Sequence, residues 1–144
     1  MSANWISKTK VGKAGEALTS PLSSSEDRAT ALEVVNYWRG IHAEALQRAF
    51  GDIEGLNAVG SDVLIAGRIK KLPTIVDKLG RPDAPSDLQT MYDIAGCRLV
   101  VSDLATLERV YSEIACLSAF DAPKTKRHDY ICLLYTSDAA DDKA

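Results

Sequence analysis

The sequence predicts an α/β (α+β) domain in which helices flank a small mixed sheet. Apolar residues recur at three- and four-residue steps over positions 25–50 and 103–117, which is typical of amphipathic helices. Short runs rich in β-branched residues over 61–70, 97–101 and 128–134 favour strands. Because helical and extended segments alternate along 144 residues, one domain with helices packed on a sheet is expected.

Residues 1–59 are predicted to form an N-terminal helical scaffold. A first helix over 5–19 contains Gly12 and Gly15, which weaken it. Ser24 or Ser25 can cap a second, longer helix, and Gly51 can end it. Its apolar stripe is expected to consist of Leu32, Val35, Trp38, Ile41, Ala45 and Ala49, widened by Leu46 and Phe50.

The second half alternates between strands and helices. After the strand over 61–70, Pro73 is well placed at a helix start, and Gly80 can close that helix. The strand over 97–101 is followed by Ser102 or Asp103, either of which can cap the next helix.

Composition excludes several classes of protein. No run of apolar residues is long enough to span a membrane, and the N-terminus lacks the layout of a signal peptide. The odd, widely spaced Cys97, Cys116 and Cys132 fit neither a disulfide framework nor a zinc site, so a cytoplasmic location is expected. The net charge is −3, whereas a general nucleic-acid binder needs a broad positive surface, so this class of protein is not expected.

A cationic cluster lies between positions 68 and 81. Arg68 and Lys70 are two apart, so on a strand they share a face, and Lys78 follows on the next helix. With Thr74 and the backbone N–H groups at the start of that helix, these side chains could hold a polyphosphate. The alternative is a solvated charged surface, since Asp77 lies within the cluster and Asp83 lies just beyond it.

Asp93 is the candidate metal ligand. It stands in an Asp-Ile-Ala-Gly-Cys-Arg run that ends at Arg98, and a carboxylate at the mouth of a strand suits Mg²⁺. The alternative is an aspartate that caps a turn and pairs with Arg98. Lys126 and Arg127 form a second basic group that could contact another phosphate or simply form a charged loop.

These motifs resemble those of the RelA/SpoT-type synthetases of the alarmone (p)ppGpp, in their small stand-alone form. The similarity rests on three blocks in order, which are Arg68-x-Lys70 with Thr74-Ile75 and Lys78-Leu79, then Asp93-Ile94-Ala95-Gly96-Cys97-Arg98, then Asp129-Tyr130-Ile131. The resemblance implies a nucleotidyltransferase-like fold and transfer of pyrophosphate from ATP to the 3′-hydroxyl of GDP or GTP.

The resemblance also implies a role for each matching residue. Asp93 would bind Mg²⁺, and Asp93, Lys78 and Arg98 would be the catalytic residues. The ATP-binding residues would be Arg68, Lys70, Thr74 and Lys78, while Lys126 and Arg127 would contact the acceptor phosphate.

The sequence departs from the family after Ile131. A Gly-Tyr-x-Ser-x-His-like block is missing, and residues 132–144 resemble a translated adapter, so we expect a non-native tail. Residues 60–131 would then be the N-terminal part of a synthetase domain, and the chain itself would be an almost inactive fragment of an active parent.

Two other functions remain open from the sequence. Related stand-alone domains are toxins that pyrophosphorylate a tRNA end with the same kind of site. A non-catalytic module that only binds nucleotide would also need the cationic cluster. The sequence does not fix the acceptor or the oligomeric state, and a homo-oligomer is compatible with it.

Overall fold

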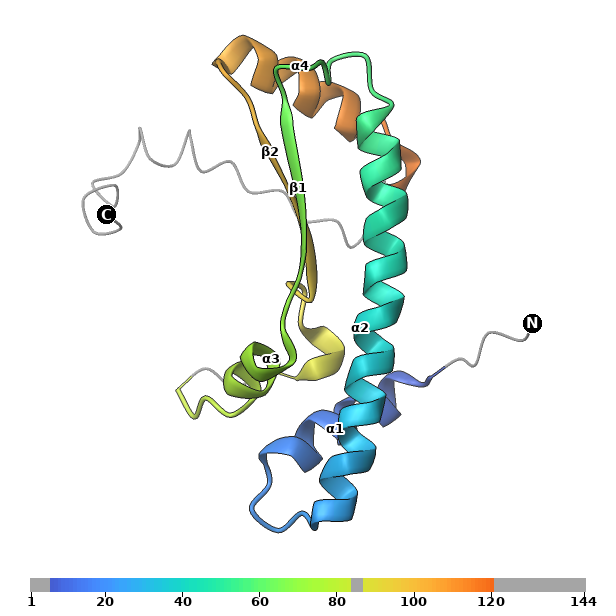
Figure 1. Ribbon diagram of the computed structural model, residues 1–144, viewed down its shortest axis with the longest axis vertical. Helices are drawn as coiled ribbons and strands as arrows, with labels where there is room; N and C mark the ends of the chain where they lie inside the picture. The colour runs from blue at the N-terminus through green and yellow to red at the C-terminus, as the bar shows by residue number, and fades with distance from the viewer. Residues whose placement is uncertain (1–5, 84–86, 121–144) are drawn as a thin grey trace.

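The computed structural model describes residues 6–83 and 87–120. Within them a long helix runs the length of the molecule beside a pair of antiparallel strands, with two short helices at one end and one at the other (Figure 1). We call this strand pair the hairpin, although α3 and η1 lie in the connection between its strands. In chain order the elements are α1 (Lys8–Thr19), α2 (Ser25–Glu54), β1 (Leu64–Ile69), α3 (Leu72–Leu79), η1 (Leu88–Thr90), β2 (Ala95–Val100), α4 (Leu104–Ala115) and η2 (Ser118–Phe120).

The predicted α+β class is confirmed at this level, because the described residues hold four α-helices and one two-stranded sheet. The strands are antiparallel, with Leu64 opposite Val100 and Ile69 opposite Ala95. The second strand therefore begins earlier than the 97–101 run predicted, since pairing with β1 starts at Ala95. The third expected strand, over 128–134, lies outside the described residues.

Helix α2 begins as predicted and ends later. Ser24 is the N-cap, and its side chain and that of Asp27 form a capping box. The prediction that Gly51 ends the helix is wrong, because the helix continues to a C-cap at Gly55. The added turn contains the buried Ile53, and its burial outweighs the roughly 1 kcal/mol that a helical glycine costs.

The predicted apolar stripe of α2 is only partly correct. The N-terminal half buries Ala31, Val34 and Val35 in the core, whereas Ile41 is exposed. The C-terminal half instead meets the hairpin, where a Cβ at Gly67 would lie 3.3 Å from Leu46 Cδ2. The N-terminal half of α2 therefore packs in the core and its C-terminal half packs on the hairpin, so its apolar residues do not form one continuous stripe.

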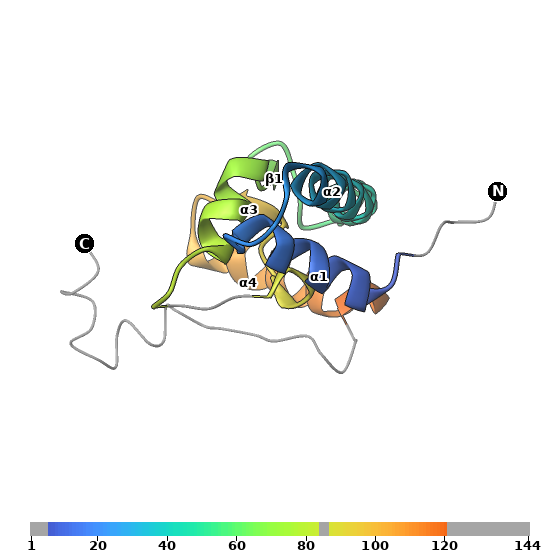
Figure 2. The same cartoon turned by 90° about the horizontal axis from the view of Figure 1, so that it is seen from below.

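Helix α1 contacts η1 closely because of its glycines. A Cβ at Gly15 would lie 3.1 Å from the Leu88 Cβ, so the residue that weakens the helix also lets η1 approach. The view from below places α1 across the end of α2, beside α3 (Figure 2). The core at this end consists of Val11, Ala14, Ala31, Val34, Val35, Ile75, Leu88, Met91 and Ile94.

Helix α2 lies against one face of the hairpin, and the other face is exposed among the described residues. Alternate strand residues Leu64 and Arg68 on β1, with Arg98 and Val100 on β2, are exposed there. No described helix combines the length and the hydropathy needed to cross a membrane.

Candidate functional site

Asp93 reaches the surface because its neighbours in the chain are anchored in the core. Met91 and Ile94 are buried, and Tyr92 and Asp93 between them are exposed. The apolar residues on either side thus fix the backbone, while the carboxylate of Asp93 remains 52% exposed. This segment connects η1 to β2, so Asp93 stands at the start of the second strand.

Lys70 lies directly beyond the end of β1, opposite this segment. Its backbone N–H donates to the carbonyl oxygen of Ile94 at 2.7 Å, which continues the hairpin ladder by one bond. The Lys70 side chain is only 7% exposed, and its Nζ donates to Asp93 Oδ2 at 2.5 Å. A nearly buried ammonium group is therefore held by a carboxylate 23 positions later in the chain.

Lys78 approaches the same carboxylate from helix α3. The helix has Pro73 in its first turn and ends at Gly80, as predicted, and it buries Ile75 in the core. Lys78 is three residues beyond Ile75, in the last turn, and its Nζ donates to Asp93 Oδ1 at 3.0 Å. Each oxygen of Asp93 thus accepts from a different lysine.

The two lysines set the protonation state of Asp93. The hydrogen bond from Lys70 is the main cause that lowers the pKa of Asp93 from 3.8 to about 2. Burial opposes this change, and Lys78 reinforces it through its own hydrogen bond and its charge. The carboxylate therefore stays ionised at more acidic pH than an ordinary aspartate does.

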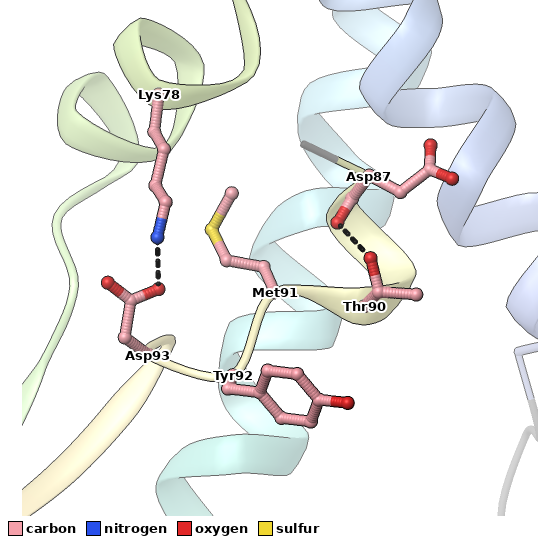
Figure 3. A pocket seen from close by; sticks show the side chains of 6 residues that line it. All are labelled: Lys78, Asp87, Thr90, Met91, Tyr92 and Asp93. Atoms are coloured by element: carbon pink, nitrogen blue, oxygen red, sulfur yellow. Dashed lines mark hydrogen bonds and ion pairs between the residues drawn. The ribbon is translucent and has the colours of Figure 1, made fainter. Parts of the chain in front are cut away.

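An open pocket of about 360 Å³ adjoins this triad. Figure 3 shows Lys78 pointing to Asp93 on one side, Met91 in the middle and Tyr92 along the lower edge. Its lining residues are Lys78, Asp87, Thr90, Met91, Tyr92 and Asp93. A cavity of this size accepts part of a nucleotide, with Lys78 and Asp93 on one side, Asp87 and Thr90 on the other, and Met91 and Tyr92 between them.

The other predicted site residues lie farther out in the fold. Arg68 on β1 and Arg98 on β2 are exposed on the open face of the hairpin, and neither lines the pocket. Thr74 is exposed in the first turn of α3. Among the described residues Asp93 pairs with Lys70 and Lys78, so the alternative pairing of Asp93 with Arg98 is not formed.

Part of the predicted cationic cluster is ordinary charged surface. Arg81 pairs with Asp77 at 2.9 Å, one turn away on α3, and both side chains are mainly exposed. Such pairs contribute little to stability. Lys126 and Arg127, the predicted acceptor-phosphate contacts, lie outside the described residues. Within the described ranges no group of three or more His, Cys, Asp or Glu side chains could hold a metal ion.

Sequence reasoning missed four of the lining residues, Asp87, Thr90, Met91 and Tyr92. Thr90 donates to the backbone oxygen of Asp87 at 3.2 Å, which stabilises the short η1 turn at the pocket wall. The sequence did contain a signal for this pocket wall. Two apolar residues, Met91 and Ile94, flank two residues with polar groups, and such a pattern predicts buried anchors with an exposed pair between them. No protein-family model and no curated protein sequence matches this chain.

Proposed function

We propose that this chain carries part of the catalytic site of a RelA/SpoT-type (p)ppGpp synthetase, with a nucleotidyltransferase-like fold. The reaction would transfer pyrophosphate from ATP to the 3′-hydroxyl of GDP or GTP. The observation that carries the proposal is the convergence of Lys70 and Lys78 on the two oxygens of Asp93 beside an open pocket.

The geometry supports binding of a polyphosphate. Lys70 and Lys78 hold two ammonium groups on opposite oxygens of one carboxylate, so a pair of positive charges is already assembled. Lysine binds phosphate as a point charge with three donors, and an entering phosphate can share these donors with Asp93. Arg68 lies two residues before Lys70 and could extend contact along the nucleotide from the hairpin.

The donor chemistry of Asp93 fits Mg²⁺. A half-exposed carboxylate offers oxygen ligands at the pocket, and Mg²⁺ in such sites commonly keeps several waters and takes one or two carboxylates plus substrate phosphates. When bound, the ion would offset charge on the transferring phosphates. The role of the lysines is to bind and orient the phosphates of ATP, and that of Arg98 would be to steady the site from β2.

Binding of Mg–ATP tests the proposal directly. Titration calorimetry should detect Mg–ATP binding by the wild type, with affinity at least roughly tenfold lower in Lys70→Ala and Lys78→Ala. The matched control is Lys71→Ala, because Lys71 is an exposed lysine of the same segment that is not paired with Asp93. Equal affinities in all four proteins would refute the proposal.

Product analysis tests the reaction itself. Labelled ATP and Mg²⁺ are offered with GDP, GTP or tRNA in separate reactions, and the products are separated by nucleotide chromatography. Because the chain is proposed to carry only part of the catalytic site, even a trace of labelled guanosine 3′-pyrophosphate that is absent in Asp93→Asn supports the synthetase. A labelled tRNA end would assign the domain to the tRNA-modifying alternative.

One observation favours a second candidate, a module that binds nucleotide without turnover. Both oxygens of Asp93 are engaged by ammonium groups, so a metal ion must compete with two lysines. Such a module would bind ATP equally well with Mg²⁺ and with EDTA and would give no product. A synthetase would bind ATP more tightly with Mg²⁺, and this gain would disappear in Asp93→Ala.

A further inference from the structure

We infer that Arg39 of helix α2 is the positioning residue of Lys70. The residue lies 31 positions before Lys70, yet its Nε donates to the Lys70 carbonyl oxygen at 3.0 Å. The same guanidinium donates through Nη1 to Asn36 Oδ1 at 3.1 Å, one turn earlier on α2. Arg39 is thus tied to its own helix while it holds the end of β1.

The hydrogen bond from Arg39 fixes the peptide group that follows the Lys70 Cα, which is its far side. On the near side, the Lys70 N–H is already bonded to the Ile94 carbonyl at 2.7 Å. With Arg39 on the carbonyl, both peptide planes that flank the Cα are held, which restricts both backbone dihedrals of Lys70. The Cα–Cβ direction is then set, and with it the path by which the side chain reaches Asp93.

The rest of the contact between α2 and the hairpin cannot supply this control. Leu46 and Phe50 pack over Gly67 through apolar contacts, which fix the separation of helix and strand. Apolar contacts are non-directional, whereas a hydrogen bond from a charged donor has a preferred geometry and is stronger than a neutral one. Arg39 therefore provides a directional link between α2 and the triad of Lys70, Asp93 and Lys78.

The first test does not depend on the proposed function. Hydrogen exchange by NMR should show the Lys70 amide exchanging about tenfold faster in Arg39→Ala, with the Val110 amide in the distant α4 unchanged. The matched control is Arg48→Ala, an exposed arginine of the same helix. Arg39→Lys keeps the charge and a donor, so it should recover part of the protection of the Lys70 amide. It also replaces Arg39→Ala in the test if that variant does not fold. An unchanged Lys70 amide in both Arg39 variants would overturn the inference.

The second test rests on the proposed function and uses Mg–ATP as the probe. Arg39→Ala should weaken Mg–ATP binding roughly tenfold in the wild-type background, and less than about twofold when Lys70→Ala is already present. Such non-additivity is expected only if Arg39 acts through Lys70. If Lys70→Ala weakens binding and Arg39→Ala does not, the inference is overturned while the proposed function stands. If neither changes binding, the proposed function fails, and the exchange measurement still decides the role of Arg39.

Discussion

Lys70 and Asp93 form an ion pair at 2.5 Å whose two members differ greatly in exposure, at 7% for the lysine and 52% for the aspartate. The asymmetry decides which substitution matters. Removal of the Asp93 carboxylate leaves a nearly buried ammonium group without its charge partner, whereas removal of Lys70 leaves a half-exposed carboxylate that water can solvate.

The first prediction compares the loss of Asp93 with the loss of Lys78. Lys78 is 33% exposed and Lys70 is nearly buried, so Asp93→Ala should destabilise the fold mainly through Lys70. We expect roughly 1–2 kcal/mol for Asp93→Ala and less than about 0.5 kcal/mol for Lys78→Met, measured by urea unfolding. Adding Lys70→Met to Asp93→Ala should restore part of the loss. Equal effects of Asp93→Ala and Lys78→Met would contradict this view of the site.

The second prediction concerns stability at acid pH. The folded-state pKa of Asp93 is lowered to about 2, from a value of 3.8 that applies to the unfolded chain. The unfolded state therefore takes up the proton first, so the contribution of Asp93 is complete above pH 3.8 and is lost as the pH falls through 2. Because the group is half exposed, the loss should be at most about 1 kcal/mol.

Urea unfolding at several pH values, in the wild type and in Asp93→Asn, measures this contribution. The stability difference between the two proteins should be constant near neutral pH and should shrink between pH 4 and pH 2. The carboxyl carbon of Asp93, followed by NMR, should titrate with a pKa of about 2, well below the 3.8 of the unfolded chain. A difference that persists unchanged to pH 2 would show that the lysines do not hold the folded carboxylate.

The third prediction uses two helical glycines with different surroundings. A Cβ at Gly15 would lie 3.1 Å from the Cβ of the fully buried Leu88, while a Cβ at Gly40 in α2 would meet nothing within 4 Å. Gly40→Ala should therefore stabilise the fold by about 0.5–1 kcal/mol. Gly15→Ala should destabilise it, since η1 must shift to admit the methyl group. Thermal unfolding followed by circular dichroism distinguishes the two, and an equal gain in both would show that η1 is loosely packed.

Local patterns were sufficient to predict the four α-helices and two strands of the described residues. Gly80 as the end of α3 follows from residue type, and Ser24 and Asp103 were each one of two candidate N-caps, for α2 and α4. Gly51 was misread because a glycine weakens a helix only slightly, and tertiary burial of Ile53 decided the outcome. Local signals thus located the elements, and packing set where they end.

The site was less predictable than the elements. Spacing alone indicated that Arg68 and Lys70 share a strand face, yet Arg68 is exposed and Lys70 is nearly buried, because β1 ends between them at Ile69. The contact of Arg39 with the Lys70 carbonyl spans 31 positions and carries no sequence signature. Contacts of this kind depend on how α2 lies against the hairpin, which periodicity does not specify.

The fourth prediction is that Mg²⁺ and polyphosphate bind to this site cooperatively. The carboxylate that would hold the ion is bonded through both oxygens, to Lys70 at 2.5 Å and to Lys78 at 3.0 Å. Mg²⁺ alone must displace these donors or bind beside two positive charges, which costs free energy. A polyphosphate gives the ammonium groups an alternative partner and brings its own oxygen ligands for the ion.

Calorimetric titration can measure this coupling without turnover. Mg²⁺ alone should bind to the protein too weakly to detect. With inorganic tripolyphosphate on the protein, Mg²⁺ should bind at least roughly tenfold more tightly than it binds to tripolyphosphate free in solution. Lys78→Met removes one competitor from Asp93, so it should strengthen binding of Mg²⁺ alone while it weakens binding of tripolyphosphate. By linkage the two ligands must enhance one another equally. If Lys78→Met leaves both affinities unchanged, the lysine does not share its carboxylate with the ion, and the arrangement is an ordinary structural ion pair.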